Sequence, residues 1–516
     1  MIHADVIGER ARLSPESTAL IYIPTGERFS YRELNDRAIR CARLWIEHLD
    51  LSKGDRVGIL AKNRVEFLDA FLAAGKTGII LVPLNTRLTP TELRSIIKDS
   101  GLKSLHYGGE FVDTVRALKN EHNIESWVAF EERAGKTDFD YGAVLSEISP
   151  SGWTSQSCDP EDLYCLLYTS GTTGIPKGVM MPHRMIAWNG YNTAICWQLR
   201  EDDVSPVFTP LYHAGGLSAF LIPIFAVGGT IVLHREFDAG EVWRAVEKYK
   251  CTVVLGVPTI YKMLLEAPEK EDADLSHVRW FISGGAPLPT ALIDDCRKLG
   301  VVLKQGYGLT EVGVNCFSMS CEEAIRKPGS IGKPMMLTQA RLLNAHRDET
   351  TPSDVGELLL RGPHVCKGYW NNPGATALAI DREGWFHTGD IARCDKEGFY
   401  YIVGRSKDMF ISGGVNVYPA EIESELLKHE AIRDVAVIGV PDATWGEVGV
   451  AFVVSVTEVT PSPGSLKNFL ASRIAKYKIP REFFFVKALP RTPYGKVRKA
   501  ELQQMFHVIS PKSEEV

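Results

Sequence analysis

Residues 163–178 read LYCLLYTSGTTGIPKG, an apolar run followed at once by a loop rich in Gly, Ser and Thr. The apolar run predicts a buried strand. Glycine lets backbone N–H groups approach an anion closely, hydroxyl groups donate further hydrogen bonds, and Lys177 adds positive charge. The stretch therefore predicts a phosphate-binding loop at the end of a strand. It is not a Walker A loop, because G-x-x-x-x-G-K-[ST] does not occur in the chain.

The segments around this loop alternate between amphipathic helices and short apolar runs. Before the loop, periodicity predicts helices at 31–48 and 64–77 and strands at 55–60 and 79–83. Similar units recur after it, at 230–233, 238–249, 252–256 and 290–299. Such alternation is typical of layered α/β sheets.

From Gly356 onward the pattern changes to short strand-like pieces between glycines, which predict a β-rich subdomain. Beyond Arg405 a compact α+β pattern follows, with helices expected at 419–429 and 463–476 and strands at 435–439 and 450–456. The junction at 404–408, GRSKD, is polar. We therefore expect an N-terminal domain at 1–404 and a smaller C-terminal domain at 405–516.

Composition excludes several protein classes. The 516 residues include 58 Lys and Arg against 64 Asp and Glu, a net charge of −6, and 45% are apolar. These values exclude general disorder, a collagen-like chain and a small disulfide scaffold. The balance of charge leaves no broad positive field for nucleic acid.

Seven arginines do gather near the start of the chain. Acidic residues lie among them, which favours a solvated face and leaves weak contact with a membrane surface as the alternative. They are Arg10, Arg12, Arg28, Arg32, Arg37, Arg40 and Arg43.

Cysteine spacing and terminal composition predict a cytoplasmic protein. The ten cysteines are scattered without a C-x-x-C pair, which indicates inert, mostly buried thiols in a reducing compartment. The N-terminus has no apolar segment of the kind that a secretion signal needs. The most apolar stretch, 217–233, is broken by Pro223 and Gly228-Gly229, so we expect a buried helix that leads into a buried strand. A homodimer is left open.

Two further clusters carry residues suited to nucleotide chemistry. GYGLTEVG, at 306–313, offers the flat face of Tyr307 to a nucleobase, and Thr310 with Glu311 could hold Mg²⁺. GWFHTGD, at 384–390, ends in Asp390, which is suited to accepting hydrogen bonds from ribose hydroxyls. Taken alone, Asp390 is more typical of a turn than of a ligand site.

Five ordered motifs together resemble the adenylate-forming superfamily, which contains acyl-CoA synthetases, aryl-CoA ligases, peptide-synthetase adenylation domains and firefly-type luciferases. The chain is most similar to bacterial fatty-acid-CoA or related carboxylate-CoA ligases, and the similarity covers nearly all of it. The motifs are YTSGTTGIPKG at 168–178, GYGLTE at 306–311, GWFHTGD at 384–390, YIVGRSKDMFISGGVNVYPAEIE at 401–423 and PRTPYGKVRK at 490–499.

The resemblance implies a two-step reaction with ATP, Mg²⁺ and coenzyme A. A carboxylate is first activated as acyl-AMP with release of pyrophosphate, and the acyl group then passes to the CoA thiol. Thr169 and Glu311 match the magnesium positions, and Thr310 matches a contact to the α-phosphate. The implied ATP and AMP contacts are Thr169, Ser170, Gly171, Thr172, Thr173, Gly174, Lys177, Gly285, Ala286, Pro287, Tyr307, Gly308, Thr310, Asp390, Arg405 and Lys496.

The resemblance also implies a mobile C-terminal domain. Lys496 matches the lysine that bridges the α-phosphate and the substrate carboxylate, whereas composition alone would make it a solvated tail residue. Lys407 stands at the hinge position. Rotation about it withdraws Lys496 and brings Gly413 and Gly414 to the site, where they would let the pantetheine arm of CoA pass. Trp445 either touches CoA or has a plain packing role.

The acyl pocket is expected around His213, which aligns with an aromatic position that lines it, although a core histidine is the alternative. Small residues at its wall favour an open apolar channel, and hence a medium- or long-chain fatty acid. These residues are Gly215, Gly216, Ser283 and Gly284. An aromatic acid such as 4-coumarate or benzoate stays open, as does a stand-alone adenylation enzyme that loads a carrier protein. A luciferase-type oxygenase and a non-catalytic binding protein are weaker alternatives, the latter because Lys496 and its partner residues are all present.

Overall fold

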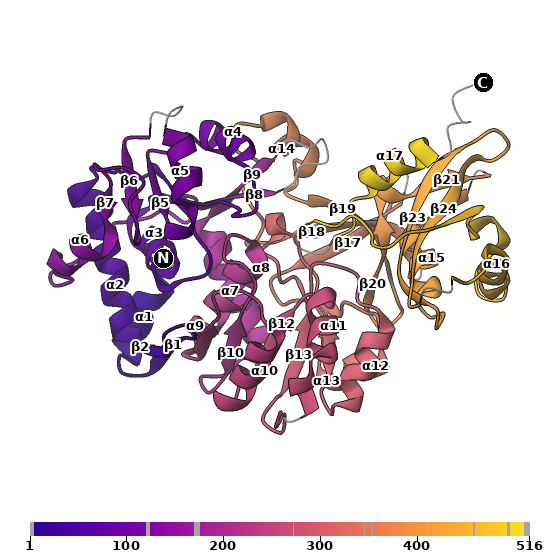
Figure 1. The fold of residues 1–516 in the computed structure, drawn as a ribbon, viewed down its shortest axis with the longest axis horizontal. Helices are drawn as coiled ribbons and strands as arrows, with labels where there is room; N and C mark the ends of the chain where they lie inside the picture. Colours follow the sequence, from indigo (N-terminus) through magenta and orange to yellow (C-terminus); the bar gives the residue numbers. More distant parts are fainter. Residues whose placement is uncertain are drawn as a thin grey trace.

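The computed structural model describes residues 5–119, 124–169, 176–271, 273–344, 346–352, 354–413, 415–457, 460–492 and 496–509. The mixed α/β architecture that the sequence predicts is confirmed, with several sheets and a separate small C-terminal unit. Figure 1 shows the chain progressing across the molecule, from an N-terminal layer through a central one to a C-terminal unit at the right of the view.

A seven-stranded sheet organises the N-terminal layer. Its order is β7-β6-β5-β3-β4-β8-β9, and all neighbours pair in parallel except the antiparallel hairpin β8–β9. The strands are β3 (Arg56–Leu60), β4 (Ile80–Pro83), β5 (Ser104–Tyr107), β6 (Ser126–Ala129), β7 (Phe139–Asp140), β8 (Leu163–Thr169) and β9 (Lys177–Pro182). The accompanying helices are α2 (Tyr31–Arg43), α3 (Val65–Thr77), α4 (Pro90–Ser100), α5 (Val112–Lys119) and α6 (Tyr141–Glu147). Parallel strands buried on both faces explain the continuous apolar runs in the sequence.

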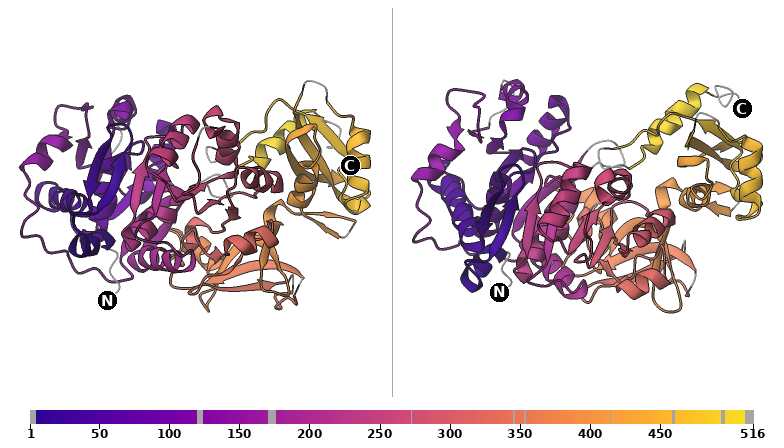
Figure 2. Two further views of the ribbon diagram at one scale, coloured as in Figure 1. Left: turned by 90° about the horizontal axis from the view of Figure 1, so that it is seen from below. Right: turned by 60° about the horizontal axis from the view of Figure 1, so that its bottom comes forward.

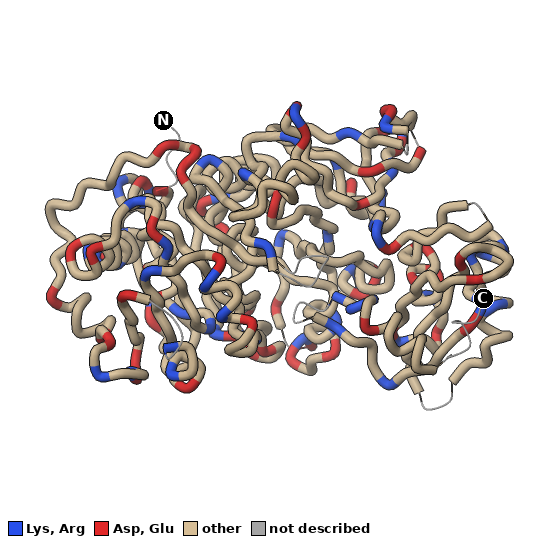
Figure 3. The backbone as a smooth tube through the Cα atoms, turned by 90° about the horizontal axis from the view of Figure 1, so that it is seen from above, with Lys and Arg blue, Asp and Glu red and all other residues tan. Residues whose placement is uncertain are grey.

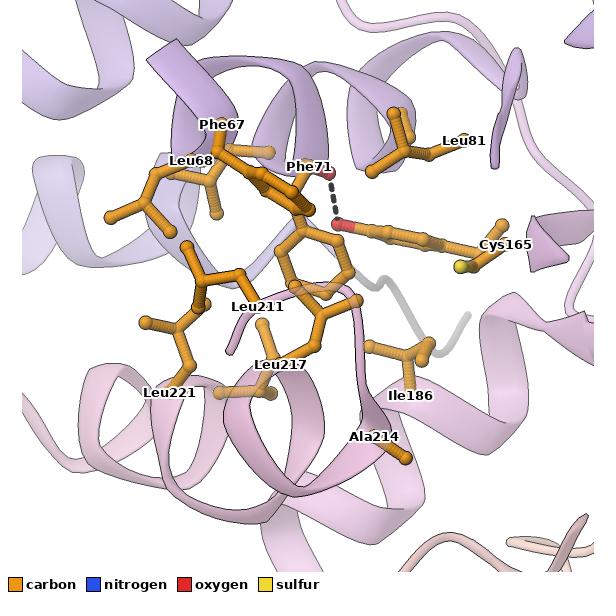
Figure 4. Close-up of a cluster of buried hydrophobic side chains, with 14 of the residues drawn as sticks. Phe67, Leu68, Phe71, Leu81, Cys165, Ile186, Leu211, Ala214, Leu217 and Leu221 are labelled. Atoms are coloured by element: carbon orange, nitrogen blue, oxygen red, sulfur yellow. Dashed lines mark hydrogen bonds between the residues drawn. The ribbon is translucent and has the colours of Figure 1, made fainter. Parts of the chain in front are cut away.

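Helix α3 joins this sheet to the central layer. Its sequence, VEFLDAFLAAGKT, is apolar nearly all round, and 12 of its 13 residues are buried. Figure 4 shows Phe67, Leu68 and Phe71 of this helix pointing toward Leu211, Leu217 and Leu221 of the central layer. The hydroxyl of Tyr164 donates to the Phe71 carbonyl at 2.6 Å, which satisfies a polar group inside this cluster.

The central layer contains two smaller sheets. One has the order β10-β11-β1-β2, and the other, β12-β13-β14, is parallel throughout. The strands are β1 (Thr18–Tyr22), β2 (Glu27–Ser30), β10 (Val204–Val207), β11 (Thr230–Leu233), β12 (Val253–Gly256), β13 (Trp280–Ser283) and β14 (Leu303–Gln305). The helices are α1 (Val6–Leu13), α7 (His183–Cys196), α8 (Ala214–Gly216), α9 (Ile222–Val227), α10 (Ala239–Lys248), α11 (Pro258–Glu266), α12 (Thr290–Lys298) and α13 (Cys321–Arg326).

The apolar stretch at 217–233 belongs to this layer. It forms a π-helical turn η3 (Leu217–Leu221), then α9, then β11, as expected for a buried helix that leads into a strand. Gly228 ends α9 at φ +91°, a left-handed conformation that glycine adopts readily. No helix within the described ranges is both long and apolar enough to cross a membrane.

A four-stranded antiparallel sheet, β17-β18-β19-β20, forms the predicted β-rich region, beside the two-stranded β15-β16. These strands are β15 (Phe317–Ser318), β16 (Lys333–Pro334), β17 (Gln339–Leu343), β18 (Val355–Arg361), β19 (Phe386–Cys394) and β20 (Tyr400–Arg405), and α14 (Pro373–Ala379) lies between β18 and β19. Figure 2 shows this region beneath the C-terminal unit.

The C-terminal unit has its own sheet, β22-β21-β24-β23, with β25 added beside β24. A separate apolar cluster lies on each face of the long β23–β24 pair, one against α15 and α16 and the other against α17. The elements are β21 (Phe410–Ser412), β22 (Val415–Val417), α15 (Pro419–Leu426), β23 (Ile432–Asp442), β24 (Gly446–Ser455), α16 (Pro463–Ala471), β25 (Glu482–Phe485) and α17 (Lys499–Ile509). The last strand of the preceding sheet ends at Arg405, so the two sheets are joined by only a short connection.

The N-terminal arginines are engaged within the fold. Arg37 forms a two-pronged ion pair with the fully buried Asp69, at 2.9 and 2.7 Å. Arg40 and Arg43 donate to the carbonyls of Ile148 and Ser151. Arg10 donates to the Ala226 carbonyl, Arg12 and Arg32 pair with glutamates, and Arg28 lies over the Tyr249 ring. Figure 3 shows basic and acidic positions interspersed along the backbone in the view from above. Each of the seven arginines thus has a partner within the fold, as expected for a solvated face of mixed charge.

All ten cysteines are free thiols, and seven of them are buried. Burial raises the pKa of Cys165 and Cys316 above the usual range of a thiol. Such thiols are unreactive at neutral pH, as their scattered positions in the sequence predict.

Candidate active site

The β8–β9 hairpin carries the two described ends of the phosphate-binding loop. Thr169 is the last residue of β8 and Lys177 the first of β9, and the two are paired across the hairpin. The ammonium of Lys177 lies 5.1 Å from the centre of the Tyr369 ring. The predicted contacts Ser170, Gly171, Thr172, Thr173 and Gly174 lie outside the described residues.

Asp390, Arg405 and Tyr307 form a second group. Asp390 in β19 and Arg405 in β20 are cross-strand partners, and Arg405 Nε lies 2.9 Å from Asp390 Oδ1. The Tyr307 hydroxyl donates to Asp390 Oδ2 at 2.6 Å. Burial, together with this carboxylate, raises the pKa of Tyr307 well above that of an ordinary tyrosine. The structure therefore brings together three residues that the sequence placed at the adenosine.

Thr310 and Glu311 lie in a 3-10 turn, η5 (Thr310–Val312). The loop before it passes so close to Val314 that a Cβ on Gly308 would lie 2.1 Å from the Val314 carbonyl oxygen. Glu311 is held twice. Its carbonyl accepts from the Cys366 amide at 2.8 Å, and its carboxylate accepts from the Tyr369 hydroxyl at 3.0 Å.

The same turn is supported from behind by His364, which is fully buried. His364 Nδ1 lies 2.7 Å from the Val312 carbonyl oxygen, so this nitrogen carries the proton and donates. His364 Nε2 then accepts from the Thr338 hydroxyl at 2.9 Å. Burial lowers the pKa of His364 despite the Val312 carbonyl, which favours the neutral ring that this geometry requires.

Lys496 reaches this site from the C-terminal unit. Its amide donates to the Thr492 hydroxyl at 3.1 Å, which orders the backbone beside it. Burial and the charge of Arg405 lower the pKa of Lys496, and the carboxylates of Asp390 and Glu311 oppose that shift. The Lys496 side chain thus lies within electrostatic reach of residues from both groups described above. Neighbouring atoms crowd the ammonium, while the residue as a whole stays exposed.

His213 directly precedes α8 and lies within electrostatic reach of Lys496. Burial, followed by the positive charges of Lys496 and Arg87, lowers the pKa of His213 to about 3. The ring is therefore neutral at physiological pH. It packs against Tyr212 with the ring centres 4.8 Å apart. Its proximity to Lys496 favours the predicted pocket position over a core histidine.

The small residues of the predicted acyl pocket fall into two classes. A Cβ on Gly215 or Gly284 would meet nothing within 4 Å, so both face open space. A Cβ on Gly216 would lie 2.4 Å from the Pro210 carbonyl oxygen, and Ser283 is fully buried. Backbone therefore occupies the space beside Gly216, whereas the space beside Gly215 and Gly284 is open.

The remaining predicted residues occupy loops. Gly285, Ala286 and Pro287 lie between β13 and α12, and Gly285 has φ +76°. Lys407 lies exposed in a short 3-10 turn, η6 (Ser406–Asp408), which follows β20.

The predicted CoA contacts are placed elsewhere. Gly413 donates its amide to the Trp445 carbonyl at 2.9 Å, and a Cβ there would lie 2.9 Å from the indole. Figure 1 places β21 and β24, which flank this pair, far from β8 and β9. Gly414 is outside the described residues. The structure therefore places Lys496 within electrostatic reach of Glu311, Asp390 and Arg405, whereas the predicted CoA residues Gly413 and Trp445 lie elsewhere.

Sequence reasoning missed the segment that holds Glu311, which runs from His364 to Trp370. Its sequence, HVCKGYW, contains no pattern of titratable residues that indicates a ligand site. The one available signal is the aromatic pair Tyr369-Trp370 after a glycine, directly before a polar turn.

Two family models match the chain. The model described as AMP-binding enzyme covers residues 7–370, and the one described as AMP-binding enzyme C-terminal domain covers residues 421–496. A feruloyl-CoA synthase from Amycolatopsis sp is 38% identical over 497 residues, which are 96% of this chain and 97% of that protein. The long-chain-fatty-acid–CoA ligase FadD13 from Mycobacterium tuberculosis is 35% identical over 514 residues, covering 98% of this chain and 99% of FadD13.

Solved structures of CoA synthetases have the same fold. ATP-bound MatB from Rhodopseudomonas palustris superposes with a TM-score of 0.89 at 32% identity, covering 98% of this chain and 99% of that one. Apo MatB, with the same coverage and identity, gives 0.79, so the present arrangement is closer to the ATP-bound form. O-succinylbenzoate CoA synthetase (MenE) from Bacillus subtilis, in complex with ATP and magnesium, gives 0.85 at 31% identity, over 97% of this chain and 99% of that one. The chain therefore belongs to the AMP-binding, adenylate-forming enzyme family, and it is an acid–thiol ligase that uses ATP, Mg²⁺ and coenzyme A.

Proposed function

We propose that the protein adenylates a carboxylic acid at the site around Lys496 and then transfers the acyl group to CoA after the C-terminal domain rotates. The observation that carries this proposal is the position of Lys496, within electrostatic reach of Glu311, Asp390 and His213, which all come from other elements. A carboxylate and a triphosphate repel each other, so the reaction needs fixed cations between them. Lys496 meets this need, because its ammonium would contact the α-phosphate and the attacking carboxylate together.

Glu311 and Thr169 would hold the magnesium ion, which when bound neutralises charge on the phosphates. These two residues fit a magnesium ion because of the atoms that their side chains offer. Both side chains offer oxygen, and no Lys, Arg or His within the described ranges forms an ion pair with Glu311. Those ranges also contain no cluster of three or more acidic, His or Cys side chains that could bind a metal by itself. That agrees with a magnesium ion held by one carboxylate together with substrate phosphates.

The other residues position the nucleotide. Asp390 would accept from the ribose hydroxyls, with Arg405 and the Tyr307 hydroxyl holding its carboxylate in place. Ala286 and Pro287 would border the adenine, and Lys177 would contact the outer phosphates. His213 would line the acyl site as a neutral ring, so it adds no charge beside the reacting carboxylate.

The second half-reaction would need the Gly413–Trp445 region in place of Lys496. We assign Lys407 as the hinge, because it lies exposed in the short turn between the last strand of one sheet and the first of the next. The present arrangement would then be the adenylating one. Closer superposition on ATP-bound than on apo MatB supports this assignment.

For the acid, the first candidate is a medium- or long-chain fatty acid. Gly215 and Gly284 face open space, and FadD13 is among the relatives. The second candidate is an aromatic acid. The feruloyl-CoA synthase relative favours it, as does the Pro210 backbone that occupies the space beside Gly216.

An acid panel with MgATP and CoA would separate the two candidates. The fatty-acid proposal expects thioester formation with C8–C18 acids and little with ferulate, 4-coumarate or benzoate. Gly215→Leu should then reduce kcat/KM for the longest acids by at least tenfold, because a side chain would occupy the open space, and spare the shortest ones. Gly464→Ala, in the C-terminal unit, is the matched control. The reverse order of acids would overturn the fatty-acid assignment and leave the ligase class intact.

A further inference from the structure

We propose that Tyr369 is a positioning residue of the nucleotide site, which keeps the cation of Lys177 and the carboxylate of Glu311 apart and aimed at the substrate. The proposal rests on the proposed function in one respect, the assignment of Glu311 to magnesium and of Lys177 to the phosphates. Its physical basis is the placement of one aromatic side chain between two opposite charges.

The backbone of Tyr369 is fixed by β9, the strand that begins with Lys177. The chain at 367–370 runs beside β9 as an additional short strand segment. Tyr369 forms an antiparallel bridge with Val179, and the Trp370 amide donates to the Gly178 carbonyl at 2.8 Å. The Tyr369 amide donates to the Thr376 hydroxyl at 2.9 Å. The ring therefore starts from a rigid backbone only a few ångströms from the phosphate-binding hairpin.

The side chain of Tyr369 contacts both charged groups. Its hydroxyl donates to Glu311 Oε1 at 3.0 Å, and its ring face lies 5.1 Å from Lys177 Nζ, a cation–π distance. Within the described ranges no ion pair joins Lys177 to Glu311. Without the ring between them, two flexible side chains of opposite charge could pair directly, and neither would then be available to ATP or to the metal.

The contact to Glu311 also selects one carboxylate oxygen. Oε1 is occupied by the tyrosine hydroxyl, which leaves Oε2 for a metal ion. The adjacent Cys366 amide holds the Glu311 backbone at 2.8 Å, so one segment orients this residue at both main chain and side chain. A hydrogen bond that orients a metal-binding carboxylate typically changes metal affinity by about 10- to 100-fold.

Tyr369→Phe tests this proposal, because it removes the hydroxyl and keeps the ring. We expect the affinity for Mn²⁺, titrated by electron paramagnetic resonance in the presence of a non-hydrolysable ATP analogue, to fall by about tenfold. Affinity for the analogue alone, without metal, should stay within twofold because the ring still faces Lys177. Tyr369→Leu should weaken that affinity too, since it also removes the ring.

Tyr164→Phe is the matched control. Tyr164 is a buried tyrosine near the start of β8, and its hydroxyl donates to the Phe71 carbonyl of α3 in the core rather than to Glu311. It should lower thermal stability and leave Mn²⁺ affinity unchanged, which separates a positioning role from a loss of packing. Wild-type Mn²⁺ affinity in Tyr369→Phe would overturn the proposal. Wild-type Mn²⁺ affinity in Glu311→Gln would instead overturn the metal assignment on which it rests.

Discussion

Lys496 reaches the site from one domain, whereas Glu311, Asp390 and His213 reach it from the other. Because Lys496 belongs to the mobile domain of the proposed mechanism, its contribution to catalysis can be tested separately from those of Glu311, Asp390 and His213. Burial and the charge of Arg405 disfavour the charged form of Lys496, whereas the carboxylates of Asp390 and Glu311 favour it. These acidic partners therefore stabilise the ammonium before the anionic substrates bind.

Lys496→Ala should therefore abolish acyl-AMP formation, measured as acid-dependent exchange of pyrophosphate into ATP. Thioester formation from a supplied acyl-AMP should be largely spared, because the proposed second step takes place with Lys496 withdrawn. Lys428→Ala is the control, an exposed lysine of the same domain whose ion pair is with Glu425, three residues earlier. Equal loss of both half-reactions would contradict the two-conformation mechanism.

At the scale of elements, packing of the helical segment 31–48 on β5 depends on a histidine that must stay neutral. His106 in β5 is fully buried, and the Trp45 indole N–H donates to His106 Nε2 at 3.2 Å. Protonation would remove that acceptor. Burial accordingly lowers the pKa of His106 to about 3.

Stability should consequently fall as pH decreases from 7 toward 5. The unfolded chain takes up a proton at His106 near pH 6.5, whereas the folded chain does not until about pH 3, so acid favours unfolding. The expected loss is about 2 kcal/mol at pH 5 from this one group. Thermal unfolding at several pH values measures it. In His106→Leu the dependence on pH should weaken between pH 7 and 5, and an unchanged dependence would exclude His106 as its source.

At the scale of the whole molecule, Trp445 lies far from the nucleotide site. The indole is 54% exposed and stacked on Gly413, in a part of the C-terminal unit remote from β8 and β9. A large exposed aromatic group beside a glycine in a left-handed conformation, φ +59°, is suited to a contact that forms only after rotation.

Trp445→Ala should lower the rate of thioester formation at least tenfold and leave pyrophosphate exchange within twofold of wild type. Tyr477→Ala removes another exposed aromatic side chain of the same domain, 42% exposed, and should affect neither step. Loss of both half-reactions in Trp445→Ala would indicate the packing role instead.

Much of the fold follows from local pattern. Apolar runs such as LYCLL become buried strands, and the interrupted run at 217–233 becomes a helix followed by a strand. For the site, the motif residues Tyr307, Asp390 and Arg405 do meet. Other features of the site could not be predicted from local sequence patterns. The close approach of the Pro210 carbonyl to Gly216, and the hydroxyl of Tyr369 on Glu311, depend on segments distant in sequence.

The sequence by itself thus determined the family, the chemistry of the cofactors and the residue types at the site. Those depend on hydroxyls, carboxylates, lysines and glycines at fixed local spacing, which can be recognised without coordinates. The tertiary structure alone decided which small residues leave open space, which carboxylate oxygen is occupied, and that Lys496 rather than Trp445 faces the nucleotide site. These outcomes depend on distances between elements far apart along the chain, and packing sets those distances.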